Sequence, residues 1–368
     1  MTGRNYDRHG LSAYCCGGCL NKIKIHGNYF YLLKMEIIMR KVCVLLLLVV
    51  GFIGLIVISP ASAGVKKPSG CECLAPAGAG GGWDFTCRVP AAQMMQKLDL
   101  IDGSMKVVNM SGSGGGKAFS HVVNTRNNDE NLIVAASAAT ATRLAQKVFG
   151  DYKADDVRWV GALGMDYGVI VVGKDSPYKT LDDLVARLKS NPKKTPIVGA
   201  SSVGGWDHIK ALLVAKEAGV KNLRSINYIP FDNGGKAMLE VIGGRAAAFT
   251  GDASEIIGQF QAGKVRILAV LSEDKIPALG DAKTAKEQGY DVIGGNWRAF
   301  YAPAGISDDA YNYWVSAVKA VAMSPEWTEI REKNGLAEFT SFGKDFDAFV
   351  RNQIENVATI SRELNIIK

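Results

Sequence analysis

After residue 70 the sequence alternates between short, apolar, β-branched runs and longer stretches with helical periodicity. The apolar runs lie at 106–109, 131–137, 168–173, 196–201, 246–252 and 265–272. The helical patterns lie at 180–189, 207–218, 253–262, 309–323 and 343–365. A strand–helix–strand rhythm of this kind is typical of parallel sheets covered by helices. The sequence therefore predicts an α/β fold, and its 368 residues are enough for two domains.

Four glycine-rich clusters lie where a strand pattern gives way to a helix pattern. They span residues 75–84, 109–117, 200–208 and 230–236. In a parallel α/β sheet such junctions lie at the carboxyl ends of the strands, where ligands bind. Glycine lets a ligand approach backbone N–H groups, and the helix that follows presents the positive end of its dipole. Each junction is thus a potential anion-binding site, although any one cluster could also serve only the geometry of a turn.

None of the clusters matches a nucleotide-binding motif. The Walker pattern fails because Ser111 stands where its first glycine is required and Ala118 where its final Ser or Thr is required. A dinucleotide-binding fingerprint fails because Lys117 and Trp83 occupy positions that need glycine. The sequence therefore predicts no nucleotide cofactor.

The basic charge of the chain does not indicate a nucleic-acid partner. The formal charge is +7, but seven Lys and Arg and only two Asp and Glu precede residue 64. The remainder of the chain carries a net charge of +2. A charge this small on 305 residues gives no reason to expect binding to a phosphate backbone.

Catalytic and metal-binding motifs are equally weak. The segment 199–203 contains Ser201 but lacks the closing glycine of a nucleophile elbow. After residue 63 the histidines are His121 and His208. His208 is a candidate general base, yet a histidine in the first turn of a helix more often caps or packs. With no His-x3-His pattern, the sequence predicts neither a metal site nor an enzyme.

An apolar run at 42–58 follows Arg40-Lys41 and precedes the small residues of 59–63. This three-part pattern predicts a signal peptide over residues 39–63, cleaved after Ala63, and therefore a periplasmic protein. The alternative is an uncleaved anchor, because 17 apolar residues approach the ~20 that span a bilayer.

Residues 1–38 do not fit a signal peptide. They place a polar segment with three cysteines ahead of the positive region. We interpret them as an upstream extension, with Met39 a better start than Met1. No second pair of ligands at zinc-finger spacing follows those cysteines.

At the glycine clusters the sequence resembles the extracytoplasmic receptors of tripartite tricarboxylate transporters, a family of bacterial periplasmic solute-binding proteins. The resemblance runs through the chain after the signal segment. Its most specific part is the string Gly-Gly-Gly-Trp-Asp-Phe-Thr-Cys-Arg at 80–88. Further parts are Ala75-Pro76, 109–116, 201–205 with His208, 228–231, the glycine pairs at 234–235 and 243–244, and 268–272.

The resemblance implies a two-lobed clamshell of the type II periplasmic-binding class, each lobe a mainly parallel sheet flanked by helices. Residues 64–166 and 293–368 would form lobe 1 and residues 167–292 lobe 2, with the chain crossing between them twice. The protein would act as a monomer that captures a small carboxylate-bearing solute and delivers it to the permease subunits of a membrane transporter. Alternatives are a periplasmic enzyme acting on an acidic metabolite and a solute-sensing subunit for signalling.

Carried over residue by residue, the resemblance implies that loop N–H groups and hydroxyls hold the solute. The implied ligand-binding residues are Gly81, Gly82, Trp83, Asp84, Asn109, Gly114, Gly115, Gly116, Ser137, Ser201, Ser202, Gly204, Gly205, Gly234, Gly235 and Asp252. Of these, Ser137 and Asp252 are the weaker transfers, and Asp252 would suit an amino or hydroxyl group. Asp232 would repel a fully ionised ligand unless it points away or meets a hydroxyl.

The cysteines that follow residue 63 are Cys71, Cys73 and Cys87. In an oxidising compartment they allow one disulfide and leave one cysteine over. We predict the pair Cys73 and Cys87. Cys71 remains a rival, because residues two apart on a strand share a face.

Overall fold

The computed structural model describes residues 67–367. The predicted extension, signal peptide and cleavage site at residues 1–63 lie outside this range. Within it, no helix combines the length and apolar character that a membrane crossing requires.

The described residues form one mixed sheet of eleven strands. The strands are β1 Glu72–Ala75, β2 Lys106–Asn109, β3 Leu132–Ser137, β4 Val157–Gly173, β5 Ile197–Gly199, β6 Tyr228–Pro230, β7 Ala248–Asp252, β8 Val265–Val270, β9 Gly295–Pro303, β10 Leu336–Ala337 and β11 Ser341–Phe342. Their order is β2-β1-β3-β9-β4-β7-β5-β6, and β8, β10 and β11 also pair with β4.

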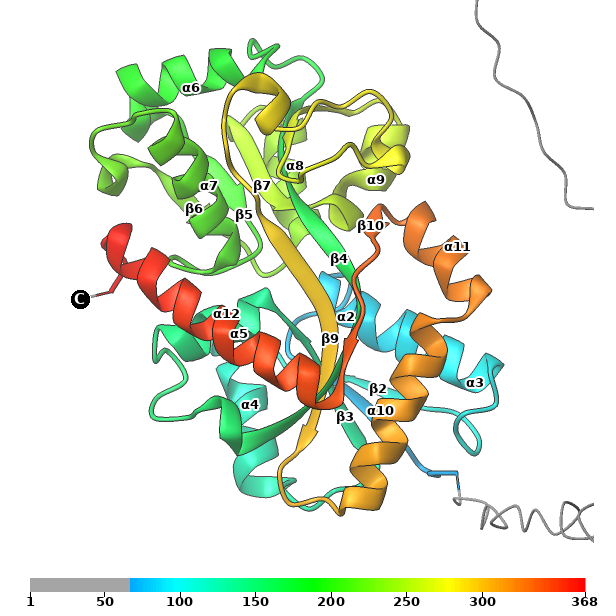
Figure 1. Ribbon diagram of the computed structural model, residues 1–368. Helices are drawn as coiled ribbons and strands as arrows, with labels where there is room; N and C mark the ends of the chain where they lie inside the picture. The colour runs from blue at the N-terminus through cyan, green and yellow to red at the C-terminus, as the bar shows by residue number, and fades with distance from the viewer. Residues whose placement is uncertain (1–66, 368) are drawn as a thin grey trace, which may run out of the picture. The chain divides into compact units, whose positions relative to one another are not determined.

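Helices flank this sheet. They are α2 Gly82–Thr86, α3 Met95–Lys97, α4 Gly116–Thr125, α5 Ala138–Ala145, α6 Leu181–Ser190, α7 Trp206–Glu217, α8 Gly234–Ile242, α9 Ala253–Gln261, α10 Asp308–Ala322, α11 Pro325–Lys333 and α12 Gly343–Glu363. Figure 1 shows α6–α9 gathered around β5–β7, and α2–α5 and α10 around β1–β3. We call the half that contains β1–β3 lobe 1 and the half that contains β5–β8 lobe 2.

Two strands, β4 and β9, run between the lobes (Figure 1). They pair antiparallel from Val157 opposite Pro303 to Tyr167 opposite Gly295. From Gly168 onward β4 pairs instead with β7 and β8 of lobe 2. The chain therefore enters lobe 2 through β4 and returns through β9.

The sheet directions refine the sequence-based expectation. Within lobe 1, β1 pairs parallel with β2 and β3, and within lobe 2, β5 pairs parallel with β6 and β7. The crossing strands pair antiparallel with every neighbour. The sheet is therefore mixed, because the strands that connect the lobes do not arise from strand–helix–strand crossovers.

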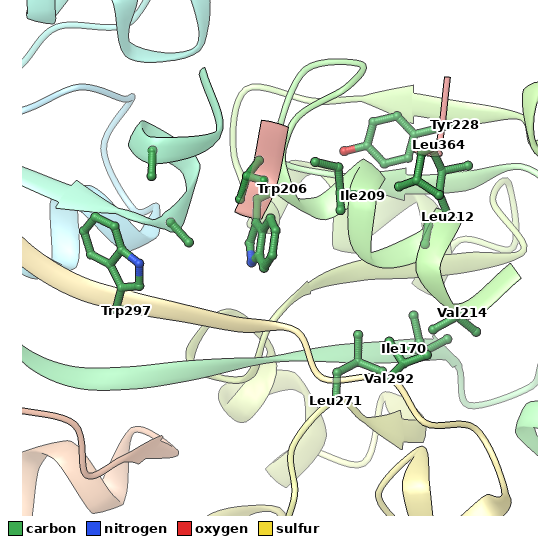
Figure 2. Packing of buried hydrophobic residues seen from close by; sticks show 14 of the residues in the cluster. Ile170, Trp206, Ile209, Leu212, Val214, Tyr228, Leu271, Val292, Trp297 and Leu364 are labelled. Carbon is green, nitrogen blue, oxygen red and sulfur yellow. The ribbon is translucent and has the colours of Figure 1, made fainter. Parts of the chain in front are cut away.

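The apolar core is continuous through the region where the lobes meet. One cluster includes Leu74 of lobe 1, Ile209 of α7 and Leu271 after β8. Figure 2 shows part of it, with Trp206 at the start of α7 and Trp297 of β9. Because close-packed interiors transmit strain, this shared core couples the positions of the strands at the crossing.

Pro90 lies inside a continuous helical stretch. The sequence predicts a kink there, since proline lacks the N–H group and clashes with the preceding turn. The structure places Pro90 in a π-helical segment, Cys87–Met94, between α2 and α3. A wider turn accommodates the proline, and the helix still begins at Gly82.

The structure joins Cys73 of β1 to Cys87 at the start of the π-helical segment, with 5.5 Å between their Cα atoms. This is the pair favoured from the sequence. Cys71 is buried without a disulfide partner among the described residues. Burial raises the pKa of its thiol to about 11, so this thiol is unreactive at neutral pH.

Replacing both Cys73 and Cys87 with alanine should lower the free energy of unfolding by about 2–4 kcal/mol, because the crosslink closes a short loop in the unfolded chain. Urea denaturation monitored by circular dichroism measures the change. Cys71→Ala is the matched control and should lower the free energy of unfolding by about 1 kcal/mol. Peptide mapping without reductant that links Cys71 to Cys87 would contradict the pairing.

Candidate functional site

A cavity of about 110 Å³ lies where several helices begin. Its lining includes Gly82, Ala139, Trp206, Asn233 and Asp252, which are N-caps or first-turn residues of α2, α5, α7, α8 and α9. The first four follow the carboxyl ends of β1, β3, β5 and β6, and Asp252 is the last residue of β7. The helix N-termini give the cavity a positive potential from backbone dipoles.

The structure brings nine of the sixteen implied residues to the cavity wall. They are Gly81, Gly82, Trp83, Gly114, Ser137, Ser201, Ser202, Gly205 and Asp252. The other seven lie outside the wall and are Asp84, Asn109, Gly115, Gly116, Gly204, Gly234 and Gly235.

Asp84 and Asn109 brace the first glycine loop. The Asp84 carboxylate accepts hydrogen bonds from the Gly80 N–H at 2.8 Å, from Arg88 Nε at 2.9 Å and from Asn109 Nδ2 at 2.9 Å. Burial would raise the Asp84 pKa, but these bonds outweigh it and the pKa lies below its ordinary value. Both side chains are therefore hydrogen-bonded to other groups of the protein, which leaves them few free donors or acceptors for a solute.

The five glycines outside the wall have backbone and packing roles. Gly115 has φ +98°, and a Cβ there would lie 3.3 Å from Trp83 Cη2. A Cβ at Gly234 would lie 2.7 Å from Glu255 Cδ. These glycines lie outside the cavity wall, and their direct contact with a solute stays a prediction.

Three glycines of the wall make room for arginine side chains. A Cβ at Gly82 would lie 2.5 Å from Arg298 Cζ. A Cβ at Gly205 would lie 2.6 Å from Arg143 Nη2, and one at Gly114 would lie 3.2 Å from Arg143 Nε. The glycine pattern thus reflects two guanidinium groups that the sequence-based site did not include.

Arg143 of α5 reaches from lobe 1 to the loop after β5 in lobe 2. Its Nη2 donates to the Ser202 carbonyl oxygen at 3.0 Å and to the Ser202 hydroxyl, and its Nη1 donates to Gln146 Oε1 at 3.0 Å. A longer bond of 3.4 Å joins Nη1 to the Val203 carbonyl oxygen. This side chain therefore connects the two lobes at the cavity.

Arg143 is also a buried cation without an acidic partner. It is 4% exposed and lines the cavity. All of its hydrogen-bond acceptors are neutral oxygens, and no carboxylate of residues 67–367 lies within 4.0 Å. Burial lowers its pKa, but an arginine stays protonated at neutral pH. A buried charge of this kind is stable only with a counter-charge or compensating dipoles.

Arg298 of β9 lies at the centre of an ionic network where the lobes meet. It is 3% exposed, and its Nη2 lies 2.5 Å from Asp166 Oδ2 and 2.9 Å from Asp252 Oδ2. Lys210 of α7 lies 2.7 Å from Asp252 Oδ1 and 2.9 Å from Asp207 Oδ1. Burial favours the neutral form of Asp252, but Lys210 and Arg298 outweigh it, so the Asp252 pKa lies below its ordinary value.

His208 braces the loop opposite Arg143. Its Nδ1 accepts a hydrogen bond from the Gly204 N–H at 2.9 Å, and its ring lies 4.6 Å from that of Tyr228. Burial and the charge of Arg143 lower its pKa to about 4. The ring is therefore neutral at neutral pH and acts as an acceptor that shapes the loop.

Asp232, which the sequence flags as a source of repulsion, lines the cavity but is directed to solvent. Its side chain is 80% exposed and pairs with Lys236 at 3.0 Å. The lysine compensates the charge, and water screens it further.

The polar residues that the sequence-based site missed share one signal. Asp166, Asn296 and Arg298 interrupt buried strands, and Arg143 is the single charge in the Ala-rich helix α5. An isolated charge inside an otherwise apolar run is a signal of a buried ion pair or a site. Whether such a charge belongs to an ion pair or to a binding site depends on neighbouring residues that are distant in the sequence.

The two-lobed α/β fold, with a small cavity at converging helix N-termini, is similar to that of solved periplasmic binding proteins. The chain belongs to the family described as tripartite tricarboxylate transporter family receptor, whose sequence pattern matches residues 90–366. This confirms the resemblance noted in the sequence and the fold class that it implies.

Individual relatives agree with this assignment. The chain is 24% identical over 308 residues to Protein BugT of Bordetella pertussis, covering 83% of this chain and 92% of BugT. Among solved structures, MatC of Rhodopseudomonas palustris with bound malate has a TM-score of 0.69 and 18% identity, covering 79% of this chain and 98% of MatC. The adipate-bound Rpa4515 of the same organism has a TM-score of 0.73 and 20% identity, covering 81% and 97%.

Proposed function

We propose that this protein is a periplasmic receptor that captures a small carboxylate-bearing solute between its lobes and delivers it to the permease subunits of a tripartite tricarboxylate-type transporter. The observation that carries the proposal is Arg143, a buried cation in the cavity wall without an acidic partner among the described residues. A solute carboxylate supplies the missing negative charge. The two carboxylate-bound relatives support this chemistry.

Backbone groups at helix N-termini also favour binding of a negatively charged solute. α5, α7, α8 and α9 direct their N-termini to the cavity, and each favours an anion there. The cavity of about 110 Å³ is small beside the roughly 300–1,000 Å³ of sites for drug-sized ligands. The solute is therefore a small metabolite.

The lobe boundaries and a hinge are part of the proposal. Residues 64–166 with 293–368 form lobe 1, and residues 167–292 form lobe 2. Support comes from β4, which changes partners between Tyr167 and Gly168. Because Arg143 in lobe 1 bonds to Ser202 in lobe 2, a solute bound at Arg143 stabilises the closed arrangement.

A screen of di- and tricarboxylates, hydroxy acids and acidic amino acids tests the binding proposal. Solute at a hundredfold excess over its dissociation constant should raise the free energy of unfolding by about 2.7 kcal/mol, which a thermal-shift assay detects. If no carboxylate raises the melting temperature, the proposal is wrong. Mass spectrometry after incubation with a binding solute should recover it unchanged, because we propose a receptor and not an enzyme.

We also propose export with cleavage after Ala63, based on the signal pattern of the sequence. The intact mass of protein recovered from the periplasm should correspond to a chain that begins at Gly64. A species that retains residues 42–58 would contradict the cleavage.

Affinity for the solute should fall as the pH rises from 7 to 9.5. Burial, together with Asp252 and Asp207, raises the pKa of Glu255 in the cavity wall to about 8, against an opposing effect of Arg298. Glu255 is therefore mostly neutral at pH 7, and it adds a negative charge that repels a carboxylate once the pH exceeds 8.

Isothermal titration calorimetry should show a loss of about three- to tenfold in affinity over this pH range. Glu255→Gln should flatten the pH profile, whereas the exposed Glu329→Gln on α11 should leave it unchanged. A profile for Glu255→Gln that matches the unsubstituted protein would contradict this role.

A further inference from the structure

Two buried polar atoms of the cavity residues have no hydrogen-bond partner among residues 67–367: the donor Trp206 Nε1 and the acceptor Asn296 Oδ1. Asn296 of β9 is 4% exposed and lines the cavity. Its Oδ1 is buried and accepts no hydrogen bond from the described residues. Buried acceptors are rarely left in this state, because leaving one unpaired costs about 1–3 kcal/mol.

The orientation of this amide is determined by its neighbour. Asn296 Nδ2 donates to Asp252 Oδ2 at 2.6 Å. Lys210 and Arg298 hold Asp252 in its ionised form, in which a carboxylate only accepts hydrogen bonds. A flipped amide would place oxygen against oxygen, so Oδ1 must be the atom that remains free.

Asp252 already accepts three hydrogen bonds from buried side chains. Its Oδ1 accepts from Lys210 Nζ at 2.7 Å, and its Oδ2 accepts from Asn296 and Arg298. That Asp252 suits an amino or hydroxyl group of the ligand stays a prediction, although three hydrogen bonds already occupy its carboxylate. The neighbouring acceptor, Asn296 Oδ1, accepts no hydrogen bond from the described residues and has its whole capacity free.

We propose that the solute carries a hydrogen-bond donor, either a hydroxyl or an ammonium group, beside its carboxylate, and that Asn296 Oδ1 accepts this hydrogen bond. The inference rests on the proposed function, because the same cavity binds the carboxylate. Asn296 is thereby a specificity-determining residue. An unsubstituted carboxylate leaves Oδ1 unpaired, and sites that are built to hydrogen-bond a ligand group reject analogues without it.

Two series of dicarboxylates that differ only at C2 test the proposal. The first series is succinate, malate and aspartate, and the second is glutarate, 2-hydroxyglutarate and glutamate. Isothermal titration calorimetry on the purified protein should show that the hydroxy or amino member of a series binds at least about tenfold more tightly than the unsubstituted member. If the hydroxy acid binds more tightly than the amino acid, the donor is a hydroxyl group. If the amino acid binds more tightly, the donor is an ammonium group.

Asn296→Leu should remove this preference and bring the ratio of affinities close to one. The matched control is Asn352→Leu on the exposed face of α12, which should retain the preference. If Asn296→Leu does not fold, as judged by circular dichroism, the smaller substitution Asn296→Ala, which also removes Oδ1, takes its place in the comparison.

The outcomes separate the two proposals. Binding of unsubstituted and substituted members with equal affinity overturns the inference and leaves the proposed function intact. A preference that persists in Asn296→Leu also overturns the inference, because another group must then accept the hydrogen bond from the solute. Absence of binding by every carboxylate in a broad screen overturns the proposed function and the inference with it.

Discussion

Arg143→Met is expected to raise the dissociation constant for the carboxylate solute by about 10- to 100-fold. The substitution keeps the unbranched stem and removes the buried positive charge that faces the cavity. Hydrogen bonds to charged groups contribute about 1.5–3 kcal/mol each, which corresponds to this range. The variant also loses the bonds to Ser202 and Val203 that join the lobes. Isothermal titration calorimetry measures the effect.

The control for this experiment is Arg187→Met on the exposed face of α6. It makes the same chemical change far from the cavity wall and should leave affinity unchanged. Arg143→Lys is informative as well, because a lysine retains the charge but not the planar fork, and should recover only part of the affinity. Affinity of Arg143→Met within twofold of the unsubstituted protein would show that the solute does not use this charge.

Arg298→Met is expected to lower the free energy of unfolding by about 3–5 kcal/mol. Arg298 is buried between Asp166 and Asp252, and its removal leaves a buried carboxylate without its partner. Lys210 still compensates Asp252, so the larger penalty falls on Asp166. Urea denaturation at pH 7.5 measures the loss.

The sign of the pH dependence provides a second measurement on Arg298→Met. An unpaired buried carboxylate has a raised pKa in the folded state, so its destabilising effect grows as the pH rises above the unfolded value near 4. The deficit relative to the unsubstituted protein should therefore be smaller at pH 5 than at pH 8. Arg187→Met should change stability by less than about 0.5 kcal/mol. A loss below about 1 kcal/mol for Arg298→Met would contradict the role assigned to the network.

Both predictions concern the place where the lobes meet. Arg143 connects α5 to the loop after β5, and Arg298 connects the crossing strand β9 to Asp166 on β4 and to Asp252 at the start of α9. The same side chains that shape the cavity thus hold the crossing together. Binding and stability are expected to be coupled in this protein for that reason.

Local patterns in the sequence determined much of the secondary structure. The run 106–109 coincides with β2, and the helical pattern at 207–218 lies within one residue of α7, Trp206–Glu217. Seven of the implied residues lie in the glycine clusters and line the cavity, and that they bind a solute stays a prediction. Periodicity and turn chemistry depend on neighbours in the chain, and therefore can be predicted from the sequence alone.

The tertiary structure decided the crossing strands and the charges of the cavity. The sequence predicted only the end of β4, at 168–173, and missed its first part and the whole of β9. Asp166 and Arg298 break the apolar pattern of these strands, although they lie buried against each other across 132 positions of sequence. Neither residue identifies its partner locally. The physical reason is that a buried charge is stable only beside its counter-charge, and the fold alone brings the two together.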